Sequence, residues 1–208
     1  MIKIEIWSDV VCPFCYIGKR RLEQALETFE RKEQVEIVFR AFQLDPSAEN
    51  NTGMDMHRLL SQKYGMSYDE ARQMNYQVAA QAKELGLDYH MDTAIPANSF
   101  DALRLTYFAK AGGKMREMVE RLMKAFWVDS LDIASHTVLA ALAAETGLDE
   151  KEALEALANG SYRDEVEADK ALGEKYGIQG VPFFIANGKY TVSGAQPTEV
   201  FLKLLNAP

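Results

Sequence analysis

The pattern of apolar residues at the start of the chain limits the possible folds more than any other feature. Three isoleucines between residues 2 and 6 alternate with charged residues, which predicts a strand with one buried face. From Pro13 to Phe29 the apolar residues recur at helical spacing, and alternation returns between residues 35 and 41. Strand, helix and strand in this order predict a βαβ unit, whose two strands run parallel.

A long helical segment follows this unit. Between residues 50 and 160 no stretch has the pattern of a strand, whereas signals for the start of a helix recur. Ser67 with Glu70 and Asp149 with Glu152 have the spacing of capping boxes. We therefore expect this part of the chain to be all helical.

Strands return near the C-terminal end. An amphipathic helix is predicted from Ser161 to Tyr176, and two short apolar stretches then flank Asn187-Gly188. Asn-Gly supplies the positive φ angles of a tight turn, so these stretches predict a β-hairpin. A last helix is expected to begin at Pro197.

The order of these elements is that of an α/β protein with a thioredoxin-like fold and an inserted all-helical domain. We expect residues 1–44 and 161–208 to form the discontinuous thioredoxin-like domain, and residues 45–160 to form the insertion.

Two cysteines, Cys12 and Cys15, stand at the predicted start of the first helix. Disulfide exchange needs one thiol with thiolate character and a second that resolves the mixed disulfide. We expect the Cys12 sulfur to be exposed and to accept hydrogen bonds from free backbone N–H groups of the first helical turn. Phe14 and Cys15 are the candidate donors, because Pro13 has no N–H. Cys15 should lie inward. Cys12 is then the attacking thiol and Cys15 the resolving one, and no cofactor is required.

Two other features bear on this interpretation. Asp9 is a candidate proton acceptor for Cys15, although Ser8 and Asp9 also suit the turn that follows the first strand.

The cysteines could instead be half of a zinc site. The three histidines are scattered with no pair at metal spacing, so we predict no metal: they are His57, His90 and His136.

Charge argues against some partners. The formal net charge is −8, and no block rich in Lys or Arg offsets it, so neither nucleic acid nor an anionic membrane is expected as a partner. The N-terminal residues lack the apolar segment of a signal peptide, and no apolar stretch is long enough to span a bilayer. We expect a cytoplasmic protein.

Several motifs resemble the DsbA-like thioredoxin family, and within it the FrnE-type cytoplasmic subgroup. The likeness covers the whole chain and is carried by Trp7-Ser8-Asp9, Cys12-Pro13-Phe14-Cys15, Gly180-Val181-Pro182 and Ser193-Gly194-Ala195-Gln196-Pro197. The resemblance implies that Pro182 is a cis-proline opposite the cysteine pair. It also implies that the backbone of Val181 pairs with an extended substrate, with Pro13 and Phe14 beside it. Asn98 suits a helix cap and, by resemblance, also substrate or glutathione binding.

The same resemblance leaves alternatives. Periplasmic members that oxidise secreted proteins usually carry His where Phe14 stands, so the direction of electron flow stays open. Kappa-class glutathione transferases and 2-hydroxychromene-2-carboxylate isomerases are similar to this chain but have Ser in place of Cys12. A glutathione-dependent transferase or isomerase is therefore one alternative, and a polypeptide-binding chaperone that uses the methionine-rich helical segment is another. Expected partners are polypeptides or small thiols, with glutathione a candidate co-substrate, for a monomer or homodimer.

Overall fold

The computed structural model describes residues 1–207, and these form two compact units. The sheet unit consists of Met1–Leu44 and the segment from Val166 onward, and the helical unit consists of Asp45–Glu165. The second boundary falls inside helix α8, Arg163–Lys175, whereas the sequence placed it before that helix, at residue 161.

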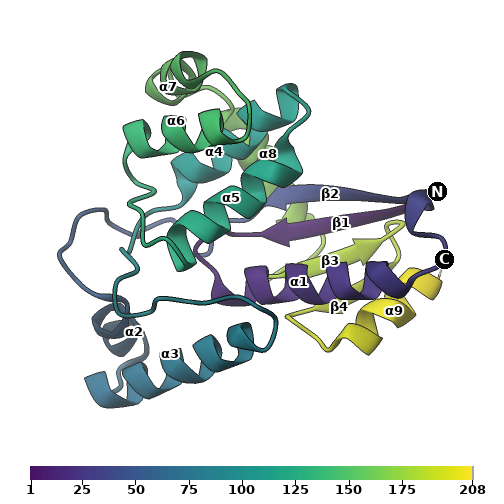
Figure 1. The fold of residues 1–208 in the computed structure, drawn as a ribbon, viewed down its shortest axis with the longest axis horizontal. Coiled ribbons are helices and arrows are strands. Elements are labelled where there is room, and N and C mark those ends of the chain that lie inside the picture. Colours follow the sequence, from purple (N-terminus) through teal and green to yellow (C-terminus); the bar gives the residue numbers. More distant parts are fainter. Residues whose placement is uncertain (208) are drawn as a thin grey trace. The chain divides into compact units, whose positions relative to one another are not determined.

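The sheet unit contains a four-stranded mixed sheet in the order β2-β1-β3-β4 (Figure 1). β1 pairs with β2 in parallel and with β3 antiparallel, and β3 pairs antiparallel with β4. The predicted βαβ unit and hairpin are therefore confirmed, with Asn187 and Gly188 at positive φ in the hairpin turn. The strands are β1 Ile2–Ser8, β2 Val35–Ala41, β3 Phe183–Ala186 and β4 Tyr190–Ser193.

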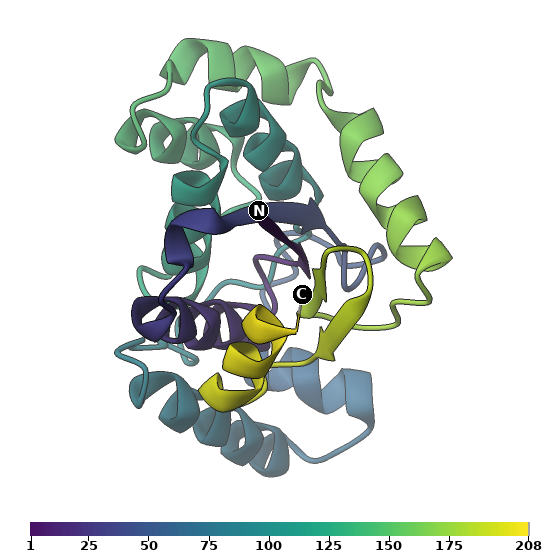
Figure 2. The ribbon, with the colours of Figure 1, turned by 90° about the vertical axis from the view of Figure 1, so that its right-hand side faces the viewer.

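The two faces of the sheet pack against different helices. Helices α1, Pro13–Thr28, and α9, Thr198–Asn206, lie side by side on one face (Figure 2). There Phe184 of β3 meets Phe201 of α9 with ring centroids 4.7 Å apart. On the other face Trp7 is fully buried, and its indole N–H donates to the carbonyl oxygen of Asp169 in α8 at 3.0 Å. A short 3-10 helix, Lys32–Gln34, precedes β2.

The helical unit contains six helices, and in four of them the side chain of the N-cap residue accepts a backbone N–H of the first turn. Ser67 and Glu70 form the predicted capping box, and the Asp149 carboxylate accepts the N–H of Glu152 at 2.8 Å. Of its methionines, Met118 and Met123 are fully buried, as core packing requires. The helices are α2 Met56–Tyr64, α3 Tyr68–Lys83, α4 Phe100–Ala111, α5 Met115–Trp127, α6 His136–Glu145 and α7 Glu150–Ala158.

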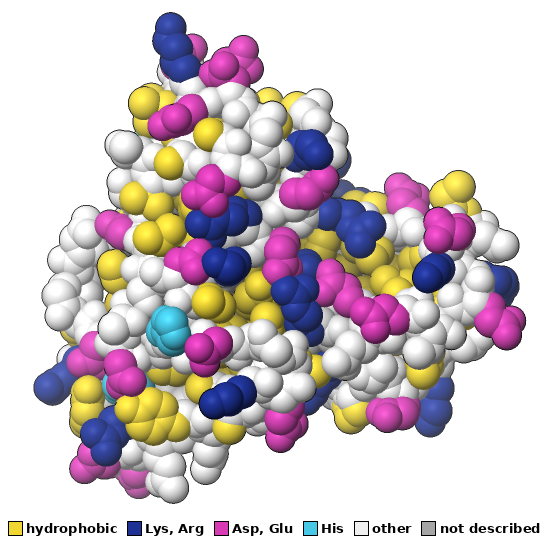
Figure 3. Space-filling view, in the orientation of Figure 1, with side chains coloured by type: hydrophobic (Ala, Val, Ile, Leu, Met, Phe, Trp, Pro, Cys, Tyr) yellow, Lys and Arg dark blue, Asp and Glu magenta, His cyan; other side chains and the backbone are white. Residues whose placement is uncertain are grey.

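Charged side chains of both signs are mixed across the face shown in Figure 3, without a continuous basic area. Among the described helices, none combines the length and the apolar character needed to cross a bilayer.

Candidate active site

The cysteine pair lies where β1 passes into α1. Cys12 is the N-cap residue of α1, with φ −92° and ψ 115°, and the helix begins at Pro13 as predicted. The N–H of Cys12 donates to the carbonyl oxygen of Asp9 at 3.2 Å, which closes the turn between strand and helix. Both cysteines are free thiols, so the structure represents the reduced pair.

The surroundings of Cys12 differ from the sequence-based prediction in two ways. Its sulfur accepts no hydrogen bond as an N-cap side chain, and the N–H of Cys15 donates instead to the carbonyl oxygen of Cys12 at 3.1 Å. The Cys12 thiol instead donates to the carbonyl oxygen of Val181, with 3.6 Å between sulfur and oxygen. Cys12 is also as buried as Cys15, at 3% and 2% exposed, so the expected difference in exposure is wrong.

The segment before β3 faces Cys12. The Val181–Pro182 peptide bond is cis, and the carbonyl oxygen of Pro182 accepts the N–H of Gly194 at 2.8 Å. Strand pairing between β1 and β3 brings this segment to the end of β1, although Cys12 and Val181 are 169 residues apart in the chain.

Gly18 lets α1 approach this proline closely, a feature that the motif analysis missed. A Cβ placed on Gly18 would lie 2.9 Å from Cγ of Pro182 and 3.2 Å from Cζ of Phe184. Such distances are too short for a side chain, so Gly18 sets the spacing between helix and loop. A glycine inside an otherwise regular helix was the signal that could have revealed it.

Cys15 has a different environment from Cys12. Burial and the neighbouring Cys12 thiol raise the pKa of the Cys15 thiol well above its ordinary value. The backbone N–H of Asp9 and the hydroxyl of Ser8 oppose this shift by hydrogen bonding to the Cys15 sulfur. Cys15 is therefore protonated at neutral pH and poor as a first attacking group.

The other residues of the motif frame the pair. Phe14 is 40% exposed, which gives this end of the sheet unit an apolar surface next to the cysteines, and Pro13 is partly buried. The carboxylate of Asp9 is buried and accepts the N–H groups of Leu44 at 2.7 Å and of Val11 at 3.4 Å. It thereby ties the turn after β1 to the end of the β2 segment.

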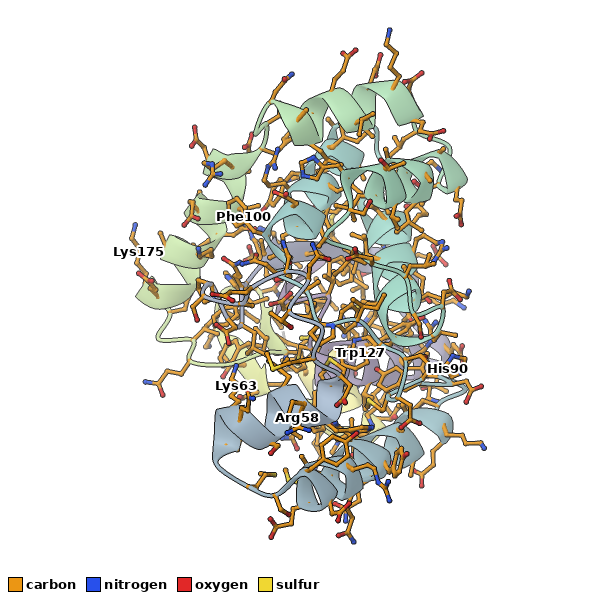
Figure 4. All side chains as sticks on the ribbon, turned by 90° about the vertical axis from the view of Figure 1, so that its left-hand side faces the viewer. Arg58, Lys63, His90, Phe100, Trp127 and Lys175 are labelled. Carbon is orange, nitrogen blue, oxygen red and sulfur yellow. The ribbon has the colours of Figure 1, made fainter. Side chains whose placement is uncertain are left out.

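Asn98 belongs to the helical unit, where its side chain has backbone partners. Its amide donates to the carbonyl oxygens of Ala48 at 2.9 Å and Pro46 at 3.3 Å. Its Oδ1 accepts the N–H of Phe100, labelled in Figure 4, at 3.0 Å. Asn98 thus caps the start of α4 and holds the loop around residues 46–50.

The histidines of the helical unit have separate polar partners. Nε2 of each lies within 3.5 Å of a carboxylate: His57 at Asp92, His90 at Asp88 and His136 at Asp101. His57 is buried, whereas His90 is half exposed, and Figure 4 shows it at the edge of the view. Within residues 1–207, no three His, Cys, Asp or Glu side chains gather in the way a metal ion would need.

Comparison with known proteins points to one family. The family model for the DSBA-like thioredoxin domain matches residues 3–206. The uncharacterized protein YwbO of Bacillus subtilis (strain 168) is 30% identical over 209 residues, which cover 99% of this chain and 96% of YwbO.

Solved structures support the same placement. The probable DsbA oxidoreductase SCO1869 from Streptomyces coelicolor is 36% identical, with a TM-score of 0.94 over 100% of this chain and 89% of that one. The cytosolic disulfide reductase DsbM from Pseudomonas aeruginosa is 18% identical, with a TM-score of 0.66 over 99% of this chain and 97% of that one, and it shares the fold. DsbM has also been solved with GSH.

Proposed function

Because the chain belongs to the family of DSBA-like thioredoxin domains, we propose that it is a thiol-disulfide oxidoreductase acting through Cys12-Pro13-Phe14-Cys15. The observation that carries the proposal is the arrangement of two free thiols around the start of α1. Cys12 contacts the loop that contains Pro182 through the carbonyl oxygen of Val181, while burial raises the pKa of the Cys15 thiol. The motifs quoted above also lead us to propose a place in the FrnE-type subgroup.

The proposed reaction has two exchange steps. The thiolate of Cys12 attacks one sulfur of a substrate disulfide, forms a mixed disulfide and releases the other sulfur as a thiolate. Cys15 then attacks Cys12, forms the internal disulfide and releases the second substrate sulfur. In the reverse direction a substrate dithiol reduces the internal disulfide. Cys12 attacks first because the raised pKa of Cys15 keeps that residue in its thiol form.

We propose that the substrate binds along the loop at Val181 and Pro182. An incoming sulfur replaces the contact between the Cys12 thiol and the Val181 carbonyl, which frees the Val181 backbone to pair with an extended segment. Exposed Phe14 supplies an apolar contact next to Pro13. The part of Asn98 in substrate binding stays a prediction.

Both redox sulfurs belong to the chain, so the reaction as proposed requires no further cofactor. Polypeptide dithiols or small thiols supply or accept the electrons. Glutathione is a candidate co-substrate, supported by a protein of the same fold, DsbM, that was solved with GSH.

Reduction of insulin and oxidative refolding of reduced ribonuclease test the proposal. We expect Cys12→Ser to abolish both activities and Cys15→Ser to accumulate mixed disulfides, because attack remains but resolution is lost. Thr28→Ala, which removes a hydroxyl bonded only to the backbone oxygen of Ala25 at the other end of α1, should keep wild-type rates.

Activity that survives in Cys12→Ser would contradict the proposal. If that variant also turned over a small aromatic electrophile with glutathione at the wild-type rate, a glutathione-dependent transferase or isomerase would be the better description. The direction of the reaction follows from the reduction potential of the pair, since roughly 30 mV corresponds to a tenfold change in the exchange equilibrium.

A further inference from the structure

One face of α1 packs against the two segments that flank the β3–β4 hairpin, the proline loop (Val181 and Pro182) and the Ala195 turn (residues 193–196). A Cβ placed on Gly18 would lie 2.9 Å from Cγ of Pro182 and 3.6 Å from Cα of Ala195. Arg21 is three residues further along α1 and therefore shares this face. Its guanidinium donates a hydrogen bond to the carbonyl oxygen of Ala195.

The Ala195 turn is itself bonded to the proline loop. The N–H of Gly194 donates to the carbonyl oxygen of Pro182 at 2.8 Å. Gln196 closes the turn, because its N–H donates to the carbonyl oxygen of Gly194 at 2.9 Å and its side-chain amide to that of Ser193 at 2.9 Å. The turn is therefore a compact link between the guanidinium of Arg21 and the backbone of Pro182.

Two side chains of α1 tie this region to the helix, and Arg21 provides the stronger contact. The second contact is a hydrogen bond of 3.1 Å from the Thr198 hydroxyl to Oε1 of Gln24, and it is exposed to solvent. The bond from Arg21 is partly buried and carries a charge on its donor. Charge-assisted hydrogen bonds are roughly twice as strong as neutral ones.

The proline loop needs this support when substrate arrives. In the structure the Cys12 thiol donates to the carbonyl oxygen of Val181, with 3.6 Å between sulfur and oxygen. Under the proposed function the incoming sulfur replaces that contact, and the backbone of Val181 pairs with an extended substrate. The loop then loses its bond to Cys12 at the moment when it has to hold the substrate. The bond between Pro182 and Gly194 remains, and Arg21 supports it through Ala195.

We propose that Arg21 is a positioning residue, whose hydrogen bond to the Ala195 turn holds the proline loop in place for a polypeptide substrate. The proposal rests on the proposed function and assigns a residue to its substrate selectivity. Backbone pairing with Val181 is open to a polypeptide, whereas a small aromatic disulfide has no backbone to pair. Arg21 therefore favours polypeptide disulfides over small ones.

Exchange with two kinds of disulfide tests this selectivity. Arg21→Met keeps the apolar stem and loses the donors, whereas Arg21→Lys keeps a charged donor. We expect Arg21→Met to raise the KM for insulin about tenfold with kcat nearly unchanged, equivalent to about 1.4 kcal/mol. Its rate with a small aromatic disulfide should stay at the wild-type value. Arg21→Lys should recover much of the loss with insulin.

The matched control is Arg31→Met, which removes an arginine beyond the end of α1. Its guanidinium lies 5.4 Å from the centre of the Phe29 ring, and this variant should reduce both disulfides at wild-type rates. A merely structural role for Arg21 would instead slow exchange with both disulfides by the same factor. That result, or an unchanged KM for insulin in Arg21→Met, would overturn the proposal.

Amide hydrogen exchange tests the contact without any disulfide chemistry. The N–H of Gly194 should be protected in the wild type, because it donates to Pro182. Arg21→Met should speed its exchange about tenfold, while amides between β1 and β2 keep their wild-type rates. Equal exchange of the Gly194 amide in both proteins would refute the positioning role. Faster exchange in a protein that exchanges no disulfides would keep that role and reject the proposed function.

Discussion

At the scale of single residues, the two cysteines differ in their partners and not in their depth. Cys12 donates its S–H to the carbonyl oxygen of Val181, whereas burial and the neighbouring Cys12 raise the pKa of the Cys15 thiol. The order of attack in the proposed reaction follows from the raised pKa of Cys15, which keeps that thiol protonated at neutral pH.

The protection of Cys15 can be measured by alkylation. In Cys12→Ser, iodoacetamide should modify folded Cys15 at pH 8 at least about tenfold more slowly than the urea-unfolded chain, because burial keeps the thiol protonated. Mass spectrometry gives both rates. The matched variant Cys15→Ser reports Cys12 in the same assay and should react faster. Equal alkylation rates for folded and unfolded Cys15 would show that the folded structure does not lower the reactivity of this thiol.

At the scale of elements, α1 packs closely against the loop that contains Pro182, because Gly18 in this helix has no side chain. Alanine at a helix interior is normally more stable than glycine by up to about 1 kcal/mol. At Gly18 the sign should reverse, because the added methyl group would overlap the ring of Pro182 at 2.9 Å.

We therefore expect Gly18→Ala to lower the free energy of unfolding by about 1–3 kcal/mol and to slow disulfide exchange. Urea unfolding and insulin reduction measure the two effects. Gly180→Ala is the control, because a Cβ there has no atom within 4 Å, and it should leave the unfolding free energy nearly unchanged. A Gly18→Ala protein as stable as the wild type would mean that the loop moves freely away from α1.

The capping box of α3 is a local element that can be tested alone. Ser67→Ala removes the side-chain acceptor for the N–H of Glu70 and should lower the free energy of unfolding by about 1 kcal/mol. Ser67→Asp retains an acceptor and should recover that loss. Urea unfolding followed by circular dichroism compares the three proteins, and an alanine variant equal to the wild type would argue against the cap.

At the scale of the whole molecule, a buried ion network joins the two chain segments of the sheet unit. Arg40 in β2 contacts Glu5 of β1 at 2.6 Å and Asp169 of α8 at 3.0 Å. Asp169 also accepts the N–H of Ala41 at 2.8 Å. Burial favours the neutral form of Glu5, but the hydrogen bond and charge of Arg40, with help from Lys3, keep the pKa of Glu5 lower than usual.

This network predicts how stability depends on pH. A carboxyl with a lowered pKa in the folded state stabilises the protein above its unfolded pKa, about 4.3 for Glu, and that contribution is lost as the pH falls through the folded value. The wild type should therefore lose stability on acidification below about pH 4.3.

Removal of the Arg40 charge should reverse the effect of acid on this site. Arg40→Met should lower the free energy of unfolding by roughly 2 kcal/mol at neutral pH, because two buried carboxylates lose their cation. In the variant, burial raises the pKa of Glu5, so the difference from the wild type should shrink as the pH falls. Urea unfolding at pH 7 and pH 4 measures this, and a constant difference would contradict the assignment.

The sequence by itself determined the elements and their order, because the signals involved are local. The alternation of apolar and charged residues between residues 2 and 6 predicted β1, and Pro13 marked the start of α1. Asn187-Gly188 predicted the turn of the β-hairpin. Each depends on a few neighbouring residues, through strand alternation, a preset φ or a positive φ. The spacing of Cys12 and Cys15 was likewise enough to predict a redox pair.

Only the tertiary structure decided what surrounds the two sulfurs. The contact of Cys12 with Val181 joins residues 169 positions apart, and it exists because β1 pairs with β3. The absence of a side chain at Gly18 allows α1 to lie close to Pro182 and Phe184, so the start of α1 and the loop before β3 meet at the cysteine pair. These contacts depend on the packing of helix against sheet, which local periodicity does not specify.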